Sequence, residues 1–287
     1  MYSNIVTGID IGGSHITAAL IDLDAHAIIP GSTIRRDIDS KGNAKSIIKE
    51  WTDAILLCKE HHPQASDRLG IAIPGPFDYN TGISGITGLD KYEALYHLNV
   101  KDLIAAALGI RAGDVYMMND ASCFLKGEVF AGAAQSGGNV IGITLGTGLG
   151  SAVFKDGSII DGDLYCSPYK EGTAEDYLST RWFIKAYQER TGKSAKNVKE
   201  IRNSIQRDET AASLFTEFGA NLGAVLSSYA KRYGADKVVV GGNIINAWEL
   251  FIPETEKVLG QHSVFVSVVK AELGEEAALL GAGSLCN

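Results

Sequence analysis

The sequence predicts a two-domain α/β protein, because one β-hairpin pattern occurs twice within an alternation of strands and helices. Residues 8–22 and 142–156 each consist of an apolar strand, a glycine-rich turn and a second strand. The chain has 287 residues, which is the length of about two ordinary domains. A duplicated motif in a chain of this length favours two related domains, and no Pro-, Ser- or charge-rich linker separates them. We therefore expect the halves to meet across a cleft.

The turns of both hairpins have the composition of phosphate-binding turns. Glycine lacks a Cβ atom, so the main chain can approach an anion closely. Successive backbone amides in such a turn form a concave nest of donors. Two of these turns, at residues 12–14 and 146–148, favour a domain pair that closes on one nucleotide.

The first domain is expected to continue its hairpin with alternating strands and helices. Hydrophobic periodicity predicts strands at 27–35, 69–73 and 115–118, and helices at 44–61 and 101–108. The turn-rich stretch 77–91 lies between them, and loops of that length are often functional. We place the domain boundary after residue 118, with the C-terminal helix in 275–287 completing the first domain, 1–118.

The second domain, 119–274, is expected to begin with a helix at 121–131. It then carries the second hairpin, helices at 173–190, 210–233 and 244–259, and strands at 237–240 and 264–269. A last helix is expected at 275–285. Pro253 should break or kink its helix, since proline lacks a backbone donor. The long helix places a stripe of apolar side chains on one face, which indicates core packing: Leu214, Phe218, Leu222 and Leu226.

Composition excludes several classes of function. A formal net charge of −8 argues against a nucleic-acid surface, and the basic-leaning stretch 190–199 is best explained as a solvated surface. No segment approaches the roughly 20 apolar residues that a membrane span needs. The first strand begins almost at once, which leaves no room for a secretory signal. We expect a cytoplasmic protein that binds neither nucleic acid nor membrane.

Cysteine and histidine spacing gives no sign of a disulfide framework or a metal site. The four cysteines show no CxxC spacing, and the six histidines show no HExxH spacing. The cysteines are expected to be free, buried thiols: Cys58, Cys123, Cys166 and Cys286.

Two familiar nucleotide motifs are disfavoured by context. Residues 146–150 read Gly-Thr-Gly-Leu-Gly, but a strand rather than a helix follows them. A Rossmann site needs the pyrophosphate at a helix N-terminus. No P-loop pattern is present either. A hairpin that clamps phosphate is the interpretation that remains.

Two carboxylates stand at positions suited to chemistry. Asp10 ends a strand directly before Gly12 and Gly13, where it would either cap the turn or lie near Mg²⁺, through water. Asp120 follows a strand and starts a helix, where it would be an N-cap or the base that accepts a proton from an attacking hydroxyl. Asn119 would then orient the acceptor.

Together these motifs resemble the ROK family of sugar kinases, within the actin, Hsp70 and hexokinase superfamily. The resemblance runs from about Ile5 to Gly283 and rests on the two hairpins, on Pro74-Gly-Pro76, on Asn119-Asp120-Ala121 and on Val238-Val-Val-Gly-Gly242. It implies an actin-like ATPase (ribonuclease H-like) fold that binds ATP and Mg²⁺ in the interdomain cleft. It implies phosphate contacts from Gly12, Gly13, Ser14, Gly146, Thr147 and Gly148, adenosine near Gly241 and Gly242, Asp120 as the base, and Asn119 and Gly75 as sugar contacts.

The chain departs from the family pattern in its sugar-binding segments. Residues 162–166, Gly-Asp-Leu-Tyr-Cys, stand where the family has Gly-Glu-Ile-Gly-His, and residues 169–179 replace its zinc-binding cysteine run. We therefore expect no structural zinc. The resemblance places Asp163 and Glu175 among the sugar ligands, against a solvated helix residue as the alternative for Glu175. Residues 85–92 replace the usual Asn-containing segment, and Tyr92 would either cover a sugar face or pack in the core.

The function that follows is an ATP-dependent sugar kinase acting on a hexose or amino sugar. The resemblance also makes a homodimer plausible. Two alternatives stay open: a transcription regulator of the same family without its DNA-binding domain, and a non-catalytic sugar sensor.

Overall fold

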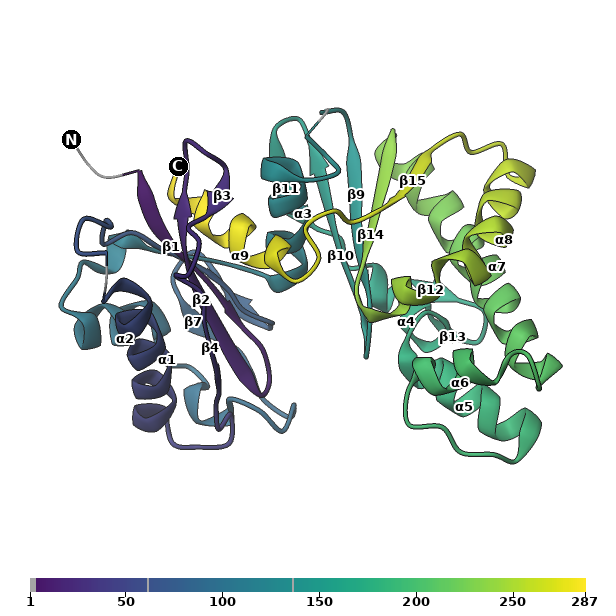
Figure 1. Ribbon diagram of the computed structural model, residues 1–287, viewed down its shortest axis with the longest axis horizontal. Coiled ribbons are helices and arrows are strands. Elements are labelled where there is room, and N and C mark those ends of the chain that lie inside the picture. The colour runs from purple at the N-terminus through teal and green to yellow at the C-terminus, as the bar shows by residue number, and fades with distance from the viewer. Residues whose placement is uncertain (1–3, 61, 136) are drawn as a thin grey trace. The chain divides into compact units, whose positions relative to one another are not determined.

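Each predicted hairpin lies in the middle of its own mixed β-sheet, and each sheet belongs to a separate unit (Figure 1). The structure, a computed structural model, describes residues 4–60, 62–135 and 137–287. The first unit comprises Met1–Gln135 and Glu275–Asn287, and the second comprises Ser136–Gly274. The two predicted hairpins are therefore the centres of two separate cores.

The sheet of the first unit combines an antiparallel hairpin with parallel strands. β1 (Ile5–Ile11) pairs antiparallel with β2 (His15–Asp22) and parallel with β5 (Leu69–Ala72), which pairs with β8 (Val115–Met118). The single strand expected at 27–35 is instead two short strands, β3 (Ala27–Ile28) and β4 (Ile34–Asp37), both paired with β2. Pro30 and Gly31, whose φ is 78°, interrupt the run.

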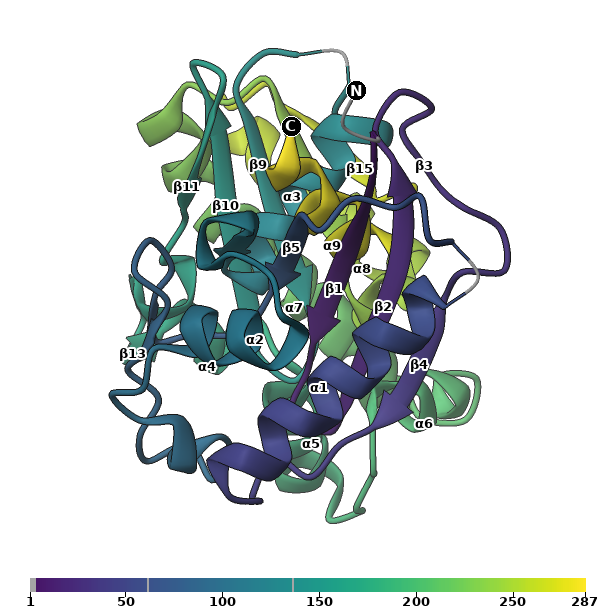
Figure 2. The same cartoon turned by 90° about the vertical axis from the view of Figure 1, so that its left-hand side faces the viewer.

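Helices cover both faces of this sheet (Figure 2). α1 (Ala44–Lys59) and α2 (Val100–Leu108) lie on one face, and α3 (Asp120–Ala131) and α9 (Glu276–Gly283) lie on the other. Asn43 and Asn99 cap α1 and α2 through their side-chain oxygens, as Asn does at helix starts. His61, where the sequence prediction ended the first helix, lies outside the described residues.

The contact between α3 and α9 decides where the first unit ends. A Cβ atom on Gly281 would stand 1.8 Å from the Cys123 carbonyl oxygen, and one on Gly127 would stand 2.0 Å from that of Ala277. Glycine at both positions lets the two backbones touch. Because α3 packs on α9, it belongs to the first unit, and the boundary follows Gln135 instead of residue 118. The C-terminal residues return to the first unit, as the sequence led us to expect.

The second unit repeats the arrangement of hairpin and parallel strand. β9 (Val140–Leu145) pairs antiparallel with β10 (Leu149–Lys155) and parallel with β14 (Lys237–Gly241), in the sheet order β11-β10-β9-β14-β15. β11 spans Ser158–Asp161 and β15 spans Ser267–Lys270. The last strand thus starts three residues later than the expected 264–269.

The helix expected at 173–190 is divided into α4 (Ala174–Tyr177) and α5 (Thr180–Thr191). Ser179 has extended backbone angles, φ −137° and ψ 165°, and the Thr180 amide donates to the Gly146 carbonyl at 2.8 Å. The break therefore directs the start of α5 at the second hairpin turn. α6 spans Val198–Ser204, and α7 spans Glu209–Tyr233.

α8 (Trp248–Gln261) continues through Pro253, so the expected break does not occur. Packing against α7 holds the helix together. A Cβ atom on Gly219 would stand 2.2 Å from the Phe251 carbonyl oxygen, and the Thr255 hydroxyl donates to the Gly219 carbonyl at 3.0 Å. The predicted apolar stripe of α7 is buried in this core with Phe183, Phe215 and Phe251.

Short elements complete both units. They are β6 (Phe77–Asp78), β7 (Ile83–Ser84), β12 (Pro168–Tyr169), β13 (Gly172–Thr173) and the 3₁₀ turns Glu93–Leu95, Ala112–Asp114, Leu164–Cys166, Asn243–Ala247 and Ser284–Cys286. In the part of the chain that the structure describes, every helix is too short or too polar to cross a membrane.

The α3–α9 contact leads to a stability prediction. Gly281→Ala should lower the free energy of unfolding by about 1–3 kcal/mol, because its methyl group has no room beside the Cys123 backbone. The matched control is Gly260→Ala in α8, where nothing lies within 4 Å of the added atom. That change should leave stability unchanged or raise it by up to about 1 kcal/mol. Urea unfolding measures both, and equal midpoints would contradict the close packing.

Candidate active site

The first glycine turn is closed by its own backbone and held by one distant side chain. The Gly12 amide donates to the His15 carbonyl at 2.9 Å. The Tyr92 hydroxyl donates to the Gly12 carbonyl. Gly13 and Ser14 are exposed at the tip, so their main chain is open to a ligand. Three of the predicted phosphate contacts therefore share one accessible turn.

Tyr92 belongs to the core and does not line a sugar surface. Its side chain is fully buried, and its ring meets Trp51 edge-on with centroids 5.3 Å apart. Of the two interpretations of Tyr92, the structure favours packing. The residue also has a second task, since its hydroxyl ties the segment 85–92 to the turn at Gly12.

Asp10 is a partly buried carboxylate beside a second carboxylate. It is the penultimate residue of β1 and lies opposite Thr17. Burial, and after it the negative charge of Asp120, raise the pKa of Asp10 to about 6, while Arg35 acts in the opposite direction. No hydrogen bond or ion pair of the Asp10 side chain occurs among the described residues, so turn capping is not supported. A carboxylate pair of this kind fits a nearby cation, which would relieve the repulsion between the two charges.

The sequence offered Asp120 as either the N-cap of a helix or a base, and Asn119 is the residue that caps the helix. Asn119 is the N-cap of α3, since its side-chain oxygen accepts from the amides of Ala121 at 2.9 Å and Ser122 at 3.3 Å. Asp120 is the first residue of the helix, is exposed, and accepts from the Ala121 amide at 2.9 Å. The N-cap interpretation of Asp120 was therefore wrong, because Asn119 occupies that position.

Tyr79 joins Asn119 to the predicted sugar contact Gly75. The Asn119 amide donates to the Tyr79 hydroxyl at 3.4 Å, and that hydroxyl donates to the Ile73 carbonyl at 3.1 Å. A Cβ atom on Gly75, which precedes a cis proline, would stand 3.1 Å from the same hydroxyl. Tyr79 was not among the predicted site residues. Its only signal was an aromatic residue within the turn-rich stretch after Pro76.

The second glycine turn is braced by Glu175. The Gly146 amide donates to the Gly148 carbonyl at 3.0 Å, and the Leu149 amide donates to Glu175 Oε2 at 2.9 Å. A Cβ atom on Gly148 would stand 2.5 Å from the same oxygen, so a larger residue there would displace the Glu175 carboxylate from this contact. The other carboxylate oxygen pairs with Arg181. Glu175 thus holds the turn in place, a role that the sequence had not indicated.

A cavity of about 680 Å³ lies beside this turn within the second unit. Its lining comes from the turn, the start of α5, α6 and the 3₁₀ turn after β14: Gly146, Thr147, Thr180, Lys196, Asn197, Val198, Lys199, Arg202, Asn203, Asn243, Ile244, Asn246 and Ala247. Gly242 connects β14 to that lining with a φ of 87°, and a Cβ atom there would stand 2.3 Å from the Leu145 carbonyl oxygen. Two predicted phosphate contacts therefore share one cavity with the residues that follow Gly241-Gly242.

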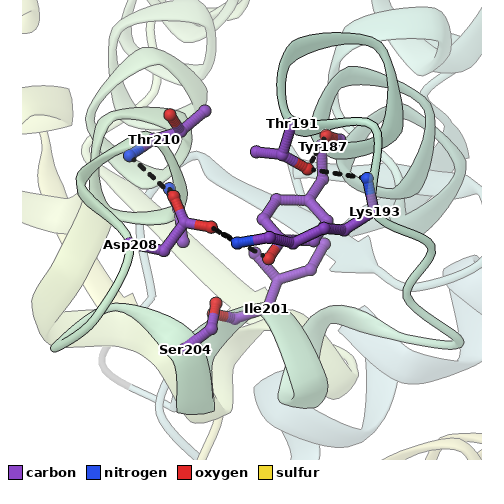
Figure 3. Close-up of polar contacts among 8 residues, drawn as sticks. Tyr187, Thr191, Lys193, Ile201, Ser204, Asp208 and Thr210 are labelled. Atoms are coloured by element: carbon purple, nitrogen blue, oxygen red, sulfur yellow. Dashed lines mark hydrogen bonds and ion pairs between the residues drawn. The ribbon is translucent and has the colours of Figure 1, made fainter.

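The basic-leaning stretch has two parts with different surroundings. Lys193 pairs with Asp208 at 3.1 Å, in a network with Tyr187 and Thr191 that ties the ends of α5 and α7 together (Figure 3). Lys196 and Lys199, by contrast, line the cavity. The prediction of a solvated surface at 190–199 did not include this position beside a cavity. The fold brings the two lysines next to a turn that lies about 50 positions earlier in the chain.

Asp163 and Cys166 are both exposed at a short 3₁₀ turn. Asp163 has a φ of 50°, and its carbonyl accepts from the Cys166 thiol at 3.2 Å and from the Ser167 hydroxyl at 3.4 Å. Ser151 anchors the segment, since its hydroxyl accepts from the Leu164 amide at 2.9 Å. The role of Asp163 toward a sugar stays a prediction.

The cysteines do not form a metal site in the described part of the chain. All four are free thiols, with Cys58, Cys123 and Cys286 buried and Cys166 exposed. Across residues 4–60, 62–135 and 137–287, no group of three or more His, Cys, Asp or Glu side chains could hold a metal ion.

Comparison with known proteins agrees with these features. The ROK family model matches residues 6–287. The chain belongs to the ROK family. This confirms the resemblance drawn from the hairpins and from the Asn119-Asp120 motif.

Similar ROK proteins cover nearly the whole chain. It is 23% identical to the glucokinase of Thermotoga maritima, over 97% of this chain and 96% of that protein. It is 24% identical to the N-acetyl-D-glucosamine kinase of Photobacterium profundum, over 97% and 98% respectively. A ROK glucokinase from Streptomyces griseus, solved in complex with glucose and AMPPNP, is 25% identical with a TM-score of 0.75, over 98% of each chain. The chain described here likewise has the two-domain, actin-like ATPase fold.

The raised pKa of Asp10 predicts a pH-dependent stability. As pH rises from about 4 toward 6, the unfolded Asp10 loses its proton while the folded one keeps it, so folding is weakened. The free energy of unfolding of Asp10→Asn, relative to that of the wild type, should therefore be higher at pH 7.5 than at pH 4.5. Urea unfolding at both pH values measures the change.

Asp114→Asn is the control of opposite sign. Its hydrogen bond from Arg111 lowers the pKa of Asp114, so its contribution to folding is present at neutral pH and lost in acid. Asp114→Asn should therefore be less stable than the wild type at pH 7.5. A difference for Asp10→Asn that does not change with pH would contradict the raised pKa.

Proposed function

We propose that this ROK protein is an ATP-dependent sugar kinase that transfers the γ-phosphoryl group to a hydroxyl of a hexose. The observation that carries the proposal is the position of Asp120. It is exposed at the start of α3 beside the capping residue Asn119, and its charge acts on Asp10 at the end of the turn strand. A proton acceptor thus stands next to a phosphate-binding turn.

Asp120 is suited to act as the general base. Transfer to an alcohol requires a group that takes the hydroxyl proton while the sugar oxygen attacks phosphorus. The new oxygen–phosphorus bond forms as the bond from the γ-phosphorus to the bridging oxygen breaks, and ADP leaves. Because Asn119 caps α3, Asp120 is not needed as the cap.

The two glycine turns would bind the phosphates of ATP. Their exposed main chain at Gly13, Ser14 and Thr147 offers amide donors that need no reorganisation during the reaction. Asp10 would hold Mg²⁺ through water. When bound, this ion neutralises charge on the phosphate oxygens. The backbone amides of the turns would add to that stabilisation.

The cavity of the second unit is a suitable place for the nucleoside. Its volume of about 680 Å³ is within the range of small-molecule sites. Val198, Ile244 and Ala247 offer apolar surface for a base, while Gly146 and Thr147 lie at the same cavity. The solved Streptomyces griseus glucokinase binds AMPPNP, which supports the same donor class here.

The acceptor is a hexose or an amino sugar. The glucokinase and N-acetyl-D-glucosamine kinase relatives support that class. Asn119 and Gly75 are the contacts we propose in the first unit, and Glu175 and Asp163 are those in the second. A cytoplasmic location and a homodimer also stay predictions.

Replacing the base tests the mechanism. Asp120→Asn should lower kcat by about 10²- to 10⁴-fold, because the amide cannot accept the proton. The affinity for AMPPNP should stay within about twofold of the wild-type value, because the substitution removes no charge-assisted hydrogen bond to the nucleotide. Coupled ADP release and titration calorimetry give the two values. Asp67→Asn removes an exposed carboxylate that pairs with Lys59 and serves as the control. Full turnover in Asp120→Asn would refute the assignment.

A sugar panel tests the reaction itself. We expect ADP release, dependent on Mg²⁺, with at least one of glucose, mannose, fructose, N-acetylglucosamine and N-acetylmannosamine. The altered residues 162–166 and 85–92 should make the preferred sugar differ from that of a standard glucokinase. Sugar binding by calorimetry without ADP release from any sugar would instead support a non-catalytic sensor.

A further inference from the structure

Lys91 lies over the first glycine turn. Its Cδ atom would be 3.7 Å from a Cβ atom on Gly13, and no other heavy atom beyond the chain neighbours lies within 4 Å of that position. Gly13 and Ser14 are exposed, whereas Lys91 is partly buried. The lysine stem thus covers one side of a turn that is otherwise open.

Neighbouring residues fix the segment that carries Lys91. Tyr92 is fully buried, its hydroxyl donates to the Gly12 carbonyl, and its amide donates to the Ser40 carbonyl at 2.7 Å. On the other side, Asp90 pairs with Lys41 at 2.6 Å. Glu93 accepts from the Leu89 amide at 2.9 Å. Because both neighbours of Lys91 are anchored, the position of its stem against Gly13 is part of the fold.

The Lys91 ammonium group has no ion pair or hydrogen bond within the described residues, although neighbouring charges do. Lys41 neutralises Asp90, and Arg35 pairs with Glu275 at 3.5 Å. A turn of backbone amides carries partial positive charge, so a cation held beside it is unfavourable unless an anion joins them. A compact ammonium next to an amide nest is a common arrangement for phosphate.

We propose that Lys91 binds the terminal phosphate of the nucleotide at the first turn. The proposal rests on the proposed function and names a donor contact for it. Residues 85–92 are one of the segments in which this chain departs from the family pattern, so the contact belongs to this chain's own sequence. Lys91 takes no proton and forms no bond to phosphorus. Its charge offsets negative charge on the phosphate oxygens, both in the bound donor and during transfer.

The test compares nucleotides that differ only in their terminal phosphates. Lys91→Met keeps most of the aliphatic stem and removes the charge, whereas Lys91→Arg keeps the charge. Calorimetry gives the Kd of each variant for AMPPNP and for AMP. We expect Lys91→Met to weaken AMPPNP binding about tenfold, the size of one charge-assisted hydrogen bond, and to change AMP binding less than about twofold. Lys91→Arg should recover most of the loss.

Lys49→Met is the matched control. It removes an equal charge from α1, where Lys49 pairs with Asp53 at 2.5 Å, and should leave both affinities unchanged. Urea midpoints verify that each variant is folded. Should Lys91→Met fail to fold, Lys91→Gln replaces it in the same comparison.

Three results would overturn the proposal. One is unchanged AMPPNP binding in folded Lys91→Met, and another is an equal loss for AMP and AMPPNP, which would indicate damage to the site in general. The third is a rise in the sugar KM alone, which would mean that Lys91 serves the acceptor. The two calorimetric readouts are independent of turnover. A wild type that releases no ADP with any sugar would refute the proposed kinase, while the AMPPNP-to-AMP comparison would still decide the role of Lys91.

Discussion

A turn that binds phosphate through its backbone cannot be held by its own side chains, so it depends on a brace from elsewhere. Each glycine turn of this protein has one. The Tyr92 hydroxyl holds the carbonyl of Gly12, and the Glu175 carboxylate holds the amide of Leu149. Both braces engage the edge of the turn and leave its tip exposed. This division keeps the donors in a fixed geometry without occupying them, which is what electrostatic preorganisation requires.

A similar division of roles is found around the carboxylates of Asp10 and Asp120. Asn119 supplies the cap of α3, so the neighbouring Asp120 does not have to cap the helix. Asp10 is kept partly buried beside Asp120, although burial and repulsion both raise its pKa. Such an arrangement costs stability in the unliganded protein. Local conflicts of this kind are expected where a site must bind a charged ligand.

Glycine has a second, purely structural role in the first unit. Gly8 and Gly70 let α9 lie directly on the sheet, and Gly127 and Gly281 let α3 and α9 touch. The C-terminal segment therefore completes the core of the unit that begins the chain. Because α3 also carries Asp120, the proposed base, at its start, this close packing fixes the position of Asp120 relative to the first turn.

The sequence by itself determined the two hairpins, their glycine turns, the Asn119-Asp120 junction and the family. These features depend on hydrophobic periodicity and turn chemistry within short windows, where local preferences decide the structure. The tertiary structure alone decided which of Asn119 and Asp120 caps the helix, where the first unit ends, and that Glu175 braces a turn. It also revealed Lys91 beside Gly13 and the basic residues at the cavity. Each of these depends on a contact between distant parts of the chain, such as Tyr92 with Gly12 or Glu175 with Leu149. Such contacts follow from how the elements pack, and no short window of sequence contains both partners.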